Sequence, residues 1–157
     1  MIIEFKDKTN NKMGNKAKFL MEMKKQKFNV PNGFVLDSDT YKDIIKENKI
    51  EEKINKLLKQ INKENIKDIS EKIKTLFNKI NINENIQEKI NNLTKENKTY
   101  AVRSSGTKED LDNYSFAGQY ETFLNVKKED INKKIIECYK SMFSEVILSY
   151  LVNNNII

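Results

Sequence analysis

The chain has 157 residues, 38% of them hydrophobic and 33% charged, a length and composition that suit one soluble globular domain. Because it contains no histidine and only one cysteine, these residues exclude a Ser-His-Asp triad, a Cys-His pair, a histidine metal ligand and an internal disulfide. The net charge of +6 suits nucleic acid or an acidic membrane surface, but lysines alternate with glutamates, so we interpret them as solvated helix faces.

The lone cysteine also bears on the compartment. It suits a reducing cytoplasm, and the surrounding IIECYKSMF indicates that Cys138 is a small buried hydrophobic residue rather than a nucleophile. The N-terminal MIIEFKDK is too short for a signal peptide, and the apolar run VILSYLV falls far below the ~20 residues of a membrane span. We therefore expect a cytoplasmic protein with no membrane partner.

The first third of the chain predicts a strand, a helix and a second strand. A strand in MIIEF is followed by a loop ending at Gly14 and a helix to about Lys27. Pro31 and Gly33 then form a turn that leads into the strand GFVL. The next helix has three N-cap candidates, Asp37, Ser38 and Asp39.

The middle of the chain is helical. Isoleucines and leucines at helical spacing from Ile50 to about Asn97 predict three short amphipathic helices, with breaks near KEN and NINEN. Since these stripes are explained by packing, we assign them no chemistry. We expect residues 39–97 to be a helical insert within a single partial domain, 1–157.

The last third returns to strands and ends in a helix. TYAVRSS predicts a strand with Tyr100 to Arg103 as its core, and residues 106–118 are polar and turn-rich. YETFLNV alternates like another strand, and KKEDINKKIIECYKSMFSEVILSYLV predicts one closing helix, with Glu129 and Asp130 suited to its first turn. The fold class is α/β (α+β), a small mixed sheet with a helical insert.

Arg103 is the only arginine in a chain that otherwise uses lysine as its basic residue. An arginine binds phosphate through two parallel hydrogen bonds, whereas lysine is a point charge that orients its partner less. Arg103 also ends a predicted strand, where α/β folds present ligand-binding groups. The alternatives at this residue are a phosphate contact and a buried ion pair with a carboxylate.

Its neighbours favour phosphate. Ser104, Ser105 and Thr107 follow with Gly106 among them, so hydroxyl and backbone N–H groups can face an anion. MGNKAK places Gly14 and Lys16 at a helix start, where free N–H groups and the helix dipole favour an anion. Neither GxxxxGK[ST] nor GxGxxG occurs, which excludes a P-loop and a Rossmann fingerprint.

Two segments carry a family resemblance. AVRSSGTKEDLDNYSFAGQYETFLNV closely resembles the signature of the N-terminal ATP-grasp region of the phosphoenolpyruvate synthase family, shared by pyruvate phosphate dikinase and rifampicin phosphotransferase. GNKAKFLMEMKKQKFNVPNGFVL resembles the opening of the same family, usually GGK, a helix and VPxGF. The two motifs stand in the family order and span nearly the whole chain.

The resemblance implies roles for individual residues. Lys16 and Arg103 match the family lysine and arginine that contact ATP phosphates. Gly118 and Thr122 match positions of the SFAGQ loop that closes over them, and Gln119 and Ser115 lie beside these. We add Ser104 to the cofactor-binding set because it follows the arginine.

Two residues depart from the family pattern. Asn15 replaces the second glycine of GGK, and Gly106 stands where alanine is usual. Asparagine tolerates left-handed backbone angles better than most residues, so the loop can survive. Glu109 and Asp110 could be metal ligands, but we interpret them as structural and assign no metal ligand and no catalytic residue.

The resemblance also implies missing parts. In the family the adenine pocket, the metal-binding carboxylates and a second phosphate arginine come from the following subdomain. The phosphohistidine belongs to a separate domain. We therefore expect the first lobe of an ATP-grasp domain, either a cut piece or a truncated gene product. It would bind ATP and Mg²⁺ at a site that a missing lobe completes. Alone it would be inactive, with the remaining domains as partners and no nucleic acid.

Other interpretations stay open. The lobe could come from a phosphoenolpyruvate synthase, a pyruvate phosphate dikinase or a rifampicin phosphotransferase-like enzyme, because acceptor choice lies in other domains. A non-catalytic basic module for RNA or a protein partner would need interleaved aromatic residues, and Phe77 is the sole aromatic between Ile50 and Asn97. Asn15 alone hints at a degenerate paralogue without ATP.

Overall fold

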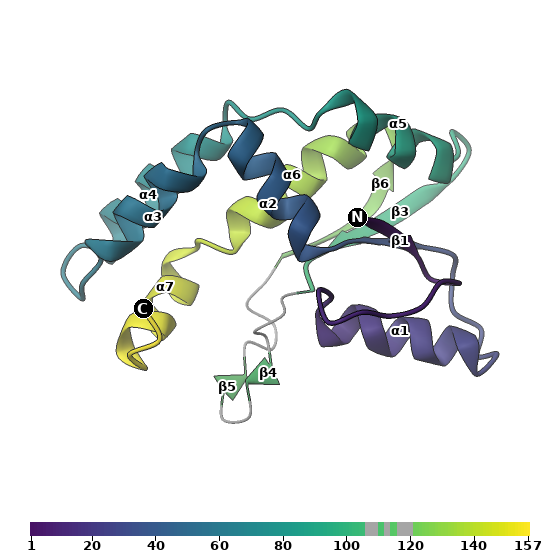
Figure 1. Ribbon diagram of the computed structural model, residues 1–157, viewed down its shortest axis with the longest axis horizontal. Helices are drawn as coiled ribbons and strands as arrows, with labels where there is room; N and C mark the ends of the chain where they lie inside the picture. Colours follow the sequence, from purple (N-terminus) through teal and green to yellow (C-terminus); the bar gives the residue numbers. More distant parts are fainter. Residues whose placement is uncertain (106–109, 112–113, 116–120) are drawn as a thin grey trace.

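The computed structural model of the protein describes residues 1–105, 110–111, 114–115 and 121–157. Helices and short antiparallel strand pairs alternate along the chain (Figure 1). The elements in chain order are β1 (Ile2–Glu4), α1 (Asn15–Lys25), β2 (Phe34–Leu36), α2 (Ser38–Glu47), α3 (Glu51–Lys59), α4 (Ile66–Phe77), α5 (Glu84–Leu93), β3 (Thr99–Arg103), β4 (Asp110–Leu111), β5 (Tyr114–Ser115), β6 (Thr122–Lys127), the 3-10 turn η1 (Lys128–Asp130), α6 (Ile131–Ser141) and α7 (Glu145–Asn153). The α/β class predicted from the sequence is confirmed.

The first three elements form a small unit with its own core. β1 and β2 pair antiparallel, with Ile3 opposite Val35. On α1, Ala17 and Met21 face this pair and join Ile3 and Met13 in a separate buried cluster. The expected strand, helix and strand are therefore all present, with α1 ending two residues before the expected Lys27.

The helical middle follows from capping as well as periodicity. The side chain of Asp37, 2% exposed, accepts a hydrogen bond from the Thr40 N–H at 3.0 Å and caps α2. Asn83 caps α5 in the same way by accepting from the Ile86 N–H at 2.9 Å. The three short helices predicted after Ile50 are α3, α4 and α5.

A bulge interrupts the pairing of β3 with β6. Tyr100 lies opposite Val126 and Val102 lies opposite Phe123, so two residues of β6 oppose one of β3. One of the two, Asn125, has a φ of 55°, in the left-handed region that asparagine tolerates. The simple alternation expected for YETFLNV is therefore broken within the strand.

The closing helix is not continuous, contrary to the prediction. The chain turns at Met142 and Phe143, and Ser144 begins a new helix by accepting a hydrogen bond from the Ile147 N–H at 3.3 Å. Phe143 is buried and its ring centroid lies 5.6 Å from that of Phe77. The turn lets Phe143 reach the core, which helical periodicity alone does not reveal.

The strands do not join into the single mixed sheet that was expected. Within the described residues they form separate antiparallel pairs, β1 with β2, β3 with β6, and β4 with β5. Ile2, Phe34 and Leu36 are half-buried against the larger core instead. The first strand pair thus contacts the rest of the molecule through side chains rather than through a shared backbone ladder.

The larger core lies among α2 to α7 and the pair of β3 and β6. Its most deeply buried members come from four helices and are Ile44, Ile73, Phe77, Ile90 and Leu148. In Figure 1, α6 crosses the centre of the molecule behind α2, and α3, α4 and α7 gather on the left. The molecule thus has two cores of unequal size.

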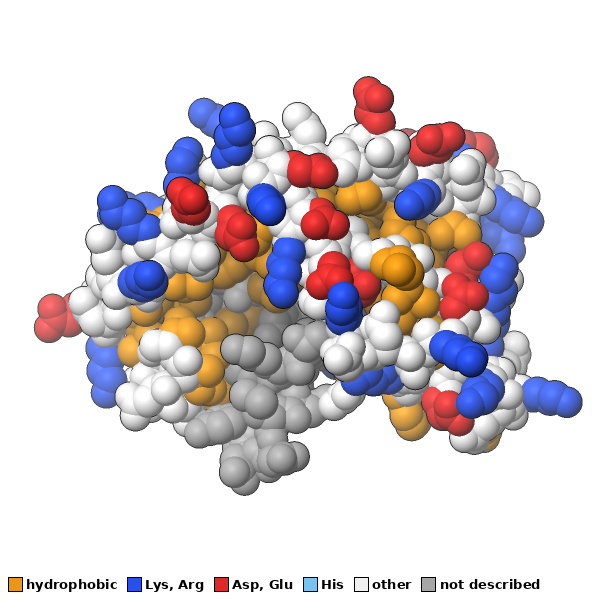
Figure 2. All heavy atoms as spheres, in the orientation of Figure 1, with side chains coloured by type: hydrophobic (Ala, Val, Ile, Leu, Met, Phe, Trp, Pro, Cys, Tyr) orange, Lys and Arg blue, Asp and Glu red, His pale blue; other side chains and the backbone are white. Residues whose placement is uncertain are grey.

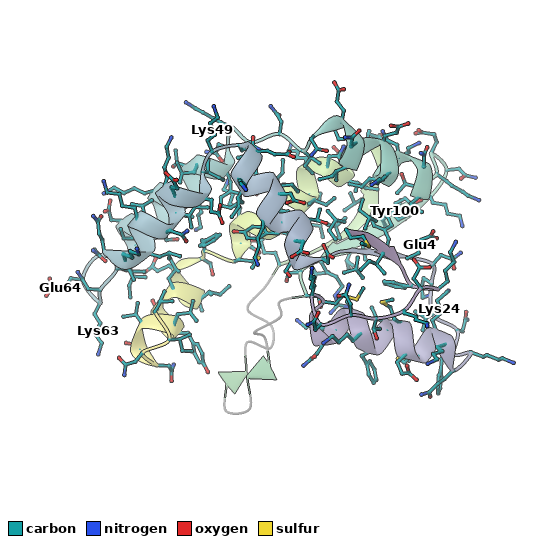
Figure 3. All side chains as sticks on the ribbon, in the orientation of Figure 1. Glu4, Lys24, Lys49, Lys63, Glu64 and Tyr100 are labelled. Atoms are coloured by element: carbon teal, nitrogen blue, oxygen red, sulfur yellow. The ribbon has the colours of Figure 1, made fainter. Side chains whose placement is uncertain are left out.

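The charged side chains cover the outside with both signs mixed. Figure 2 shows lysine and acidic side chains interspersed on the face in view, without a block of one sign. Lys49 and Lys63 are exposed and point outward in Figure 3. This arrangement supports the interpretation of the lysines as solvated helix faces. Of the helices in the described residues, none has the length and apolar character to cross a membrane.

Candidate functional site

The start of α1 carries the first half of the predicted site. Gly14 is the N-cap residue and has no side chain to cap the helix. Asn15 and Lys16 follow in the first turn, where backbone N–H groups point out of the helix and the dipole favours an anion. Lys16 is half-buried. The first turn thus presents a cation and helix N–H groups together.

Asn15 needs no unusual backbone here. It begins α1 with a helical backbone, and it is not among the described non-glycine residues with positive φ. The replacement of the family glycine by asparagine therefore introduces no left-handed strain. The backbone at Asn15 thus gives no support to the interpretation as a degenerate paralogue.

The end of β3 carries the second half. Arg103 lies directly opposite Thr122 of β6, and both side chains are exposed. Directly paired residues of an antiparallel ladder project from the same face, so the guanidinium and the hydroxyl share one side. The exposure of Arg103 also argues against the alternative of a buried ion pair.

Ser104 follows Arg103 with its hydroxyl turned inward. Its Oγ atom is buried and has no hydrogen-bond partner among the described residues. Buried hydroxyls in folded proteins almost always have a partner, so this group has unused hydrogen-bonding capacity beside Arg103.

Ser105 joins the two halves. Its Oγ accepts a hydrogen bond from the Ala17 N–H at 3.1 Å, across 88 positions of sequence. Gly14 packs so closely on the same residue that a Cβ placed there would lie 2.3 Å from the Ser105 carbonyl oxygen. Figure 1 shows α1 beginning beside the point where the chain leaves β3. Lys16 and Arg103, 87 positions apart in sequence, are thus each within two residues of this contact.

A buried thiol lies beneath the start of β6. Cys138 of α6 is 5% exposed, and its Sγ lies 4.0 Å from the Glu121 carbonyl oxygen. Burial, reinforced by the nearby carboxylates of Glu121 and Glu137, raises the pKa of this thiol to about 12. The raised pKa disfavours the thiolate needed for nucleophilic chemistry near neutral pH, and the burial predicted for Cys138 is confirmed.

Several predicted residues lie outside the described part of the chain. They are Gly106, Thr107, Glu109, Gly118 and Gln119. β4 and β5 are described as a backbone ladder, with Asp110 opposite Ser115. In the ranges that are described, no group of three or more acidic, cysteine or histidine side chains could hold a metal ion.

Two hollows of the described surface are lined by residues other than the predicted site residues. One is lined by Asn55, Leu58, Lys59 and Ile157, and Figure 2 shows apolar side chains exposed at the left of the molecule. The other is lined by Lys74, Glu121, Glu137, Lys140, Ser141 and Ser144, whose lysines and glutamates balance in charge. Among the described residues, the candidate site lies where α1 begins and β3 ends.

Sequence reasoning missed the capping role of Ser105. The serine was identified only as one of several hydroxyls near Arg103. The available signal was at the other partner, because a helix that starts at glycine lacks the usual Ser, Thr, Asp or Asn side-chain cap. The free N–H groups of such a helix start can be capped by a side chain from a distant part of the chain, but the sequence does not indicate which one.

Comparison with known proteins shows the family to which the chain is similar. The protein-family model described as "Pyruvate phosphate dikinase, AMP/ATP-binding domain" matches residues 10–157. A probable phosphoenolpyruvate synthase of Archaeoglobus fulgidus is 35% identical over 151 residues, covering 89% of this chain. A phosphoenolpyruvate synthase of Aquifex aeolicus is 33% identical over 133 residues and 77% of the chain. A rifampicin phosphotransferase of Bacillus subtilis is 33% identical over 153 residues and 90% of the chain.

The relatives are much longer than this chain. The matched region covers 20% of the Archaeoglobus protein, 16% of the Aquifex protein and 17% of the Bacillus protein. The similarity therefore concerns one part of each relative.

Proposed function

Because the chain belongs to the pyruvate phosphate dikinase AMP/ATP-binding domain family, we propose that it binds the phosphates of ATP where α1 begins and β3 ends. The observation that carries the proposal is the contact of Ser105 with the start of α1, which brings the Lys16 segment beside the Arg103 segment. The same surface joins a helix N-terminus, a lysine and an exposed arginine, three features that stabilise bound phosphate.

Each residue has a distinct part in this proposal. The Arg103 guanidinium binds two oxygens of one phosphate, because its planar fork matches them. Lys16 adds a second positive charge from the helix start, and the exposed Thr122 hydroxyl donates to a phosphate oxygen. Ser104 belongs to the proposed set as a donor whose inward-turned hydroxyl rotates toward the phosphate when ATP binds. Gly118 and Gln119 belong to the proposed loop that covers the phosphates, on the strength of the family motif. Binding of this kind acts mainly by positioning and charge neutralisation.

The proposal extends to the longer protein of which such a lobe is part. There it holds ATP in an ATP-grasp domain for phosphoryl transfer to a histidine outside these residues, as a dikinase-type phosphotransferase of the phosphoenolpyruvate synthase kind. The chain itself contains no histidine, which agrees with a donor-binding role. The described residues offer no cluster fit for a metal ion, so we assign Mg²⁺ no ligand among them.

Calorimetric titration with a non-hydrolysable ATP analogue and Mg²⁺ tests the proposal. We expect the wild-type chain to bind and Arg103→Lys to bind about tenfold more weakly, because one of two charge-assisted hydrogen bonds is lost. Lys63→Arg is the matched control, since Lys63 lies at the exposed turn between α3 and α4, at the far left of Figure 3. It should bind like the wild type.

Two results would count against the proposal. A wild-type chain that does not bind the analogue would remove the ATP half-site from this chain. If Arg103→Lys binds the analogue with wild-type affinity, the chain binds ATP, but Arg103 does not make two hydrogen bonds to one phosphate.

A further inference from the structure

The proposed site lies on the border between two separately packed parts of the molecule. Ala17, next to Lys16, is buried in the small cluster with Ile3, Met13 and Met21. Val102, next to Arg103, packs against the larger cluster. The two proposed phosphate-binding cations therefore do not share a core, and their separation depends on how the two parts are held together.

Ser105 joins the two parts at the site itself, while Lys12, just before α1, accepts a hydrogen bond from the Ser38 N–H at 3.0 Å. Ala17 is the third residue of α1, so its N–H has no partner within the helix, and the Ser105 hydroxyl takes the place of an N-cap side chain. The approach is close because Gly14 carries no Cβ. A directional hydrogen bond and a backbone contact thus meet at one residue.

We propose that Ser105 is a positioning residue for ATP, which holds the start of α1 at the end of β3 and so sets the spacing between Lys16 and Arg103. This rests on the proposed function above. Ser105 acts through these two residues and needs no contact with ATP itself. Bound phosphate requires charges placed to within a fraction of an ångström, so a joint that loosens by about 1 Å weakens binding without removing either charge.

The test is a double-mutant cycle read by titration with the same ATP analogue and Mg²⁺. Ser105→Ala should weaken binding roughly three- to tenfold, the effect of losing one hydrogen bond. In a Lys16→Ala background the same change should have little further effect, because the charge that Ser105 positions is gone. A serine that is only structural would weaken binding by the same factor in both backgrounds.

Ser144→Ala is the matched control. Ser144 also caps a helix by accepting from the N–H of the third helical residue, but at α7. Ser144→Ala should lower the free energy of unfolding by about as much as Ser105→Ala does, and it should leave the affinity for the analogue unchanged. Equal weakening by Ser144→Ala and Ser105→Ala would overturn the proposal.

Hydrogen exchange separates this inference from the proposed function. Without ligand, the Ala17 amide should exchange roughly tenfold faster in Ser105→Ala than in the wild type. Unchanged exchange would show that the contact is not made and overturn the positioning role, whether or not ATP binds. If exchange changes and the wild type does not bind the analogue, the proposed function fails and the positioning role with it. If the wild type binds and Ser105→Ala binds equally well, only the positioning role fails.

Discussion

Arg103 is a single arginine in a chain with 29 basic residues, and its place in the structure is compatible with the proposed phosphate contact. It is exposed at the end of β3, opposite Thr122, where a solvated lysine would serve equally well if only charge mattered. A planar guanidinium has an advantage over an ammonium group where two oxygens must be held in a fixed orientation. The sequence predicted the strand end correctly, whereas the exposure of Arg103 is visible only in the structure.

Gly14 is needed for space rather than for backbone freedom. Its φ is −72° and its ψ is 162°, which any residue adopts without strain. A Cβ at this position would nevertheless lie 2.3 Å from the Ser105 carbonyl oxygen and 2.5 Å from the Ser105 Oγ. Because the carbonyl is backbone, it cannot rotate away as a side chain would.

We therefore expect Gly14→Ala to lower the free energy of unfolding by about 1–3 kcal/mol, the usual range for overpacking. Gly33→Ala is the matched control: its Cβ would meet the Phe5 ring at 2.8 Å, and that side chain can move. Gly33→Ala should lower the free energy of unfolding by clearly less than Gly14→Ala does. Urea denaturation of both variants measures the difference, and equal losses would show that the contact of Gly14 with Ser105 is not tight in solution.

At the scale of elements, the predictions succeed where one period dominates and fail where a local irregularity is added. The stripes of isoleucine predict α3, α4 and α5 because each helix buries one face. The bulge at Asn125 and the turn at Phe143 each depend on contacts with distant residues. Both lie within apolar patterns that continue across the break, so the sequence gives little sign of them.

The contact of α2 with α6 buries groups that titrate at high pH. The rings of Tyr41 and Tyr139 lie 4.9 Å apart, and burial raises the pKa of both above the ordinary value of 10.0. On α6, burial raises the pKa of Cys138 from 9.0 to about 12. In the folded state these groups keep their protons at a pH where the unfolded chain loses them.

The free energy of unfolding should therefore be unaffected by these groups below about pH 9 and fall as pH rises from there toward 12. Cys138 alone contributes at most about 1.4 kcal/mol per pH unit. Urea denaturation at several pH values gives the slope. In Cys138→Ala the slope of the unfolding free energy against pH should be shallower by up to about 1.4 kcal/mol per pH unit, the contribution of one proton. The same slope in both proteins would contradict the buried, protonated thiol.

For the whole molecule, the order of the elements could be predicted from the sequence, but the contact between the two proposed site segments could not. Lys16 and Arg103 were selected from local chemistry and a family resemblance. Neither source says that α1 begins without its own side-chain cap and takes one from Ser105, 88 positions beyond Ala17. Contacts over such separations depend on the whole fold, and the division into two cores is likewise visible only in three dimensions.

The most direct test of the account is a two-dimensional ¹⁵N–¹H spectrum of the chain titrated with the non-hydrolysable ATP analogue and Mg²⁺. The account predicts that the largest changes in amide chemical shift occur in residues 15–17, residues 103–105 and Thr122. The amide signals of α4 should not shift. Shifts centred instead on the hollow lined by Asn55, Leu58, Lys59 and Ile157 would contradict it, as would a spectrum that does not change.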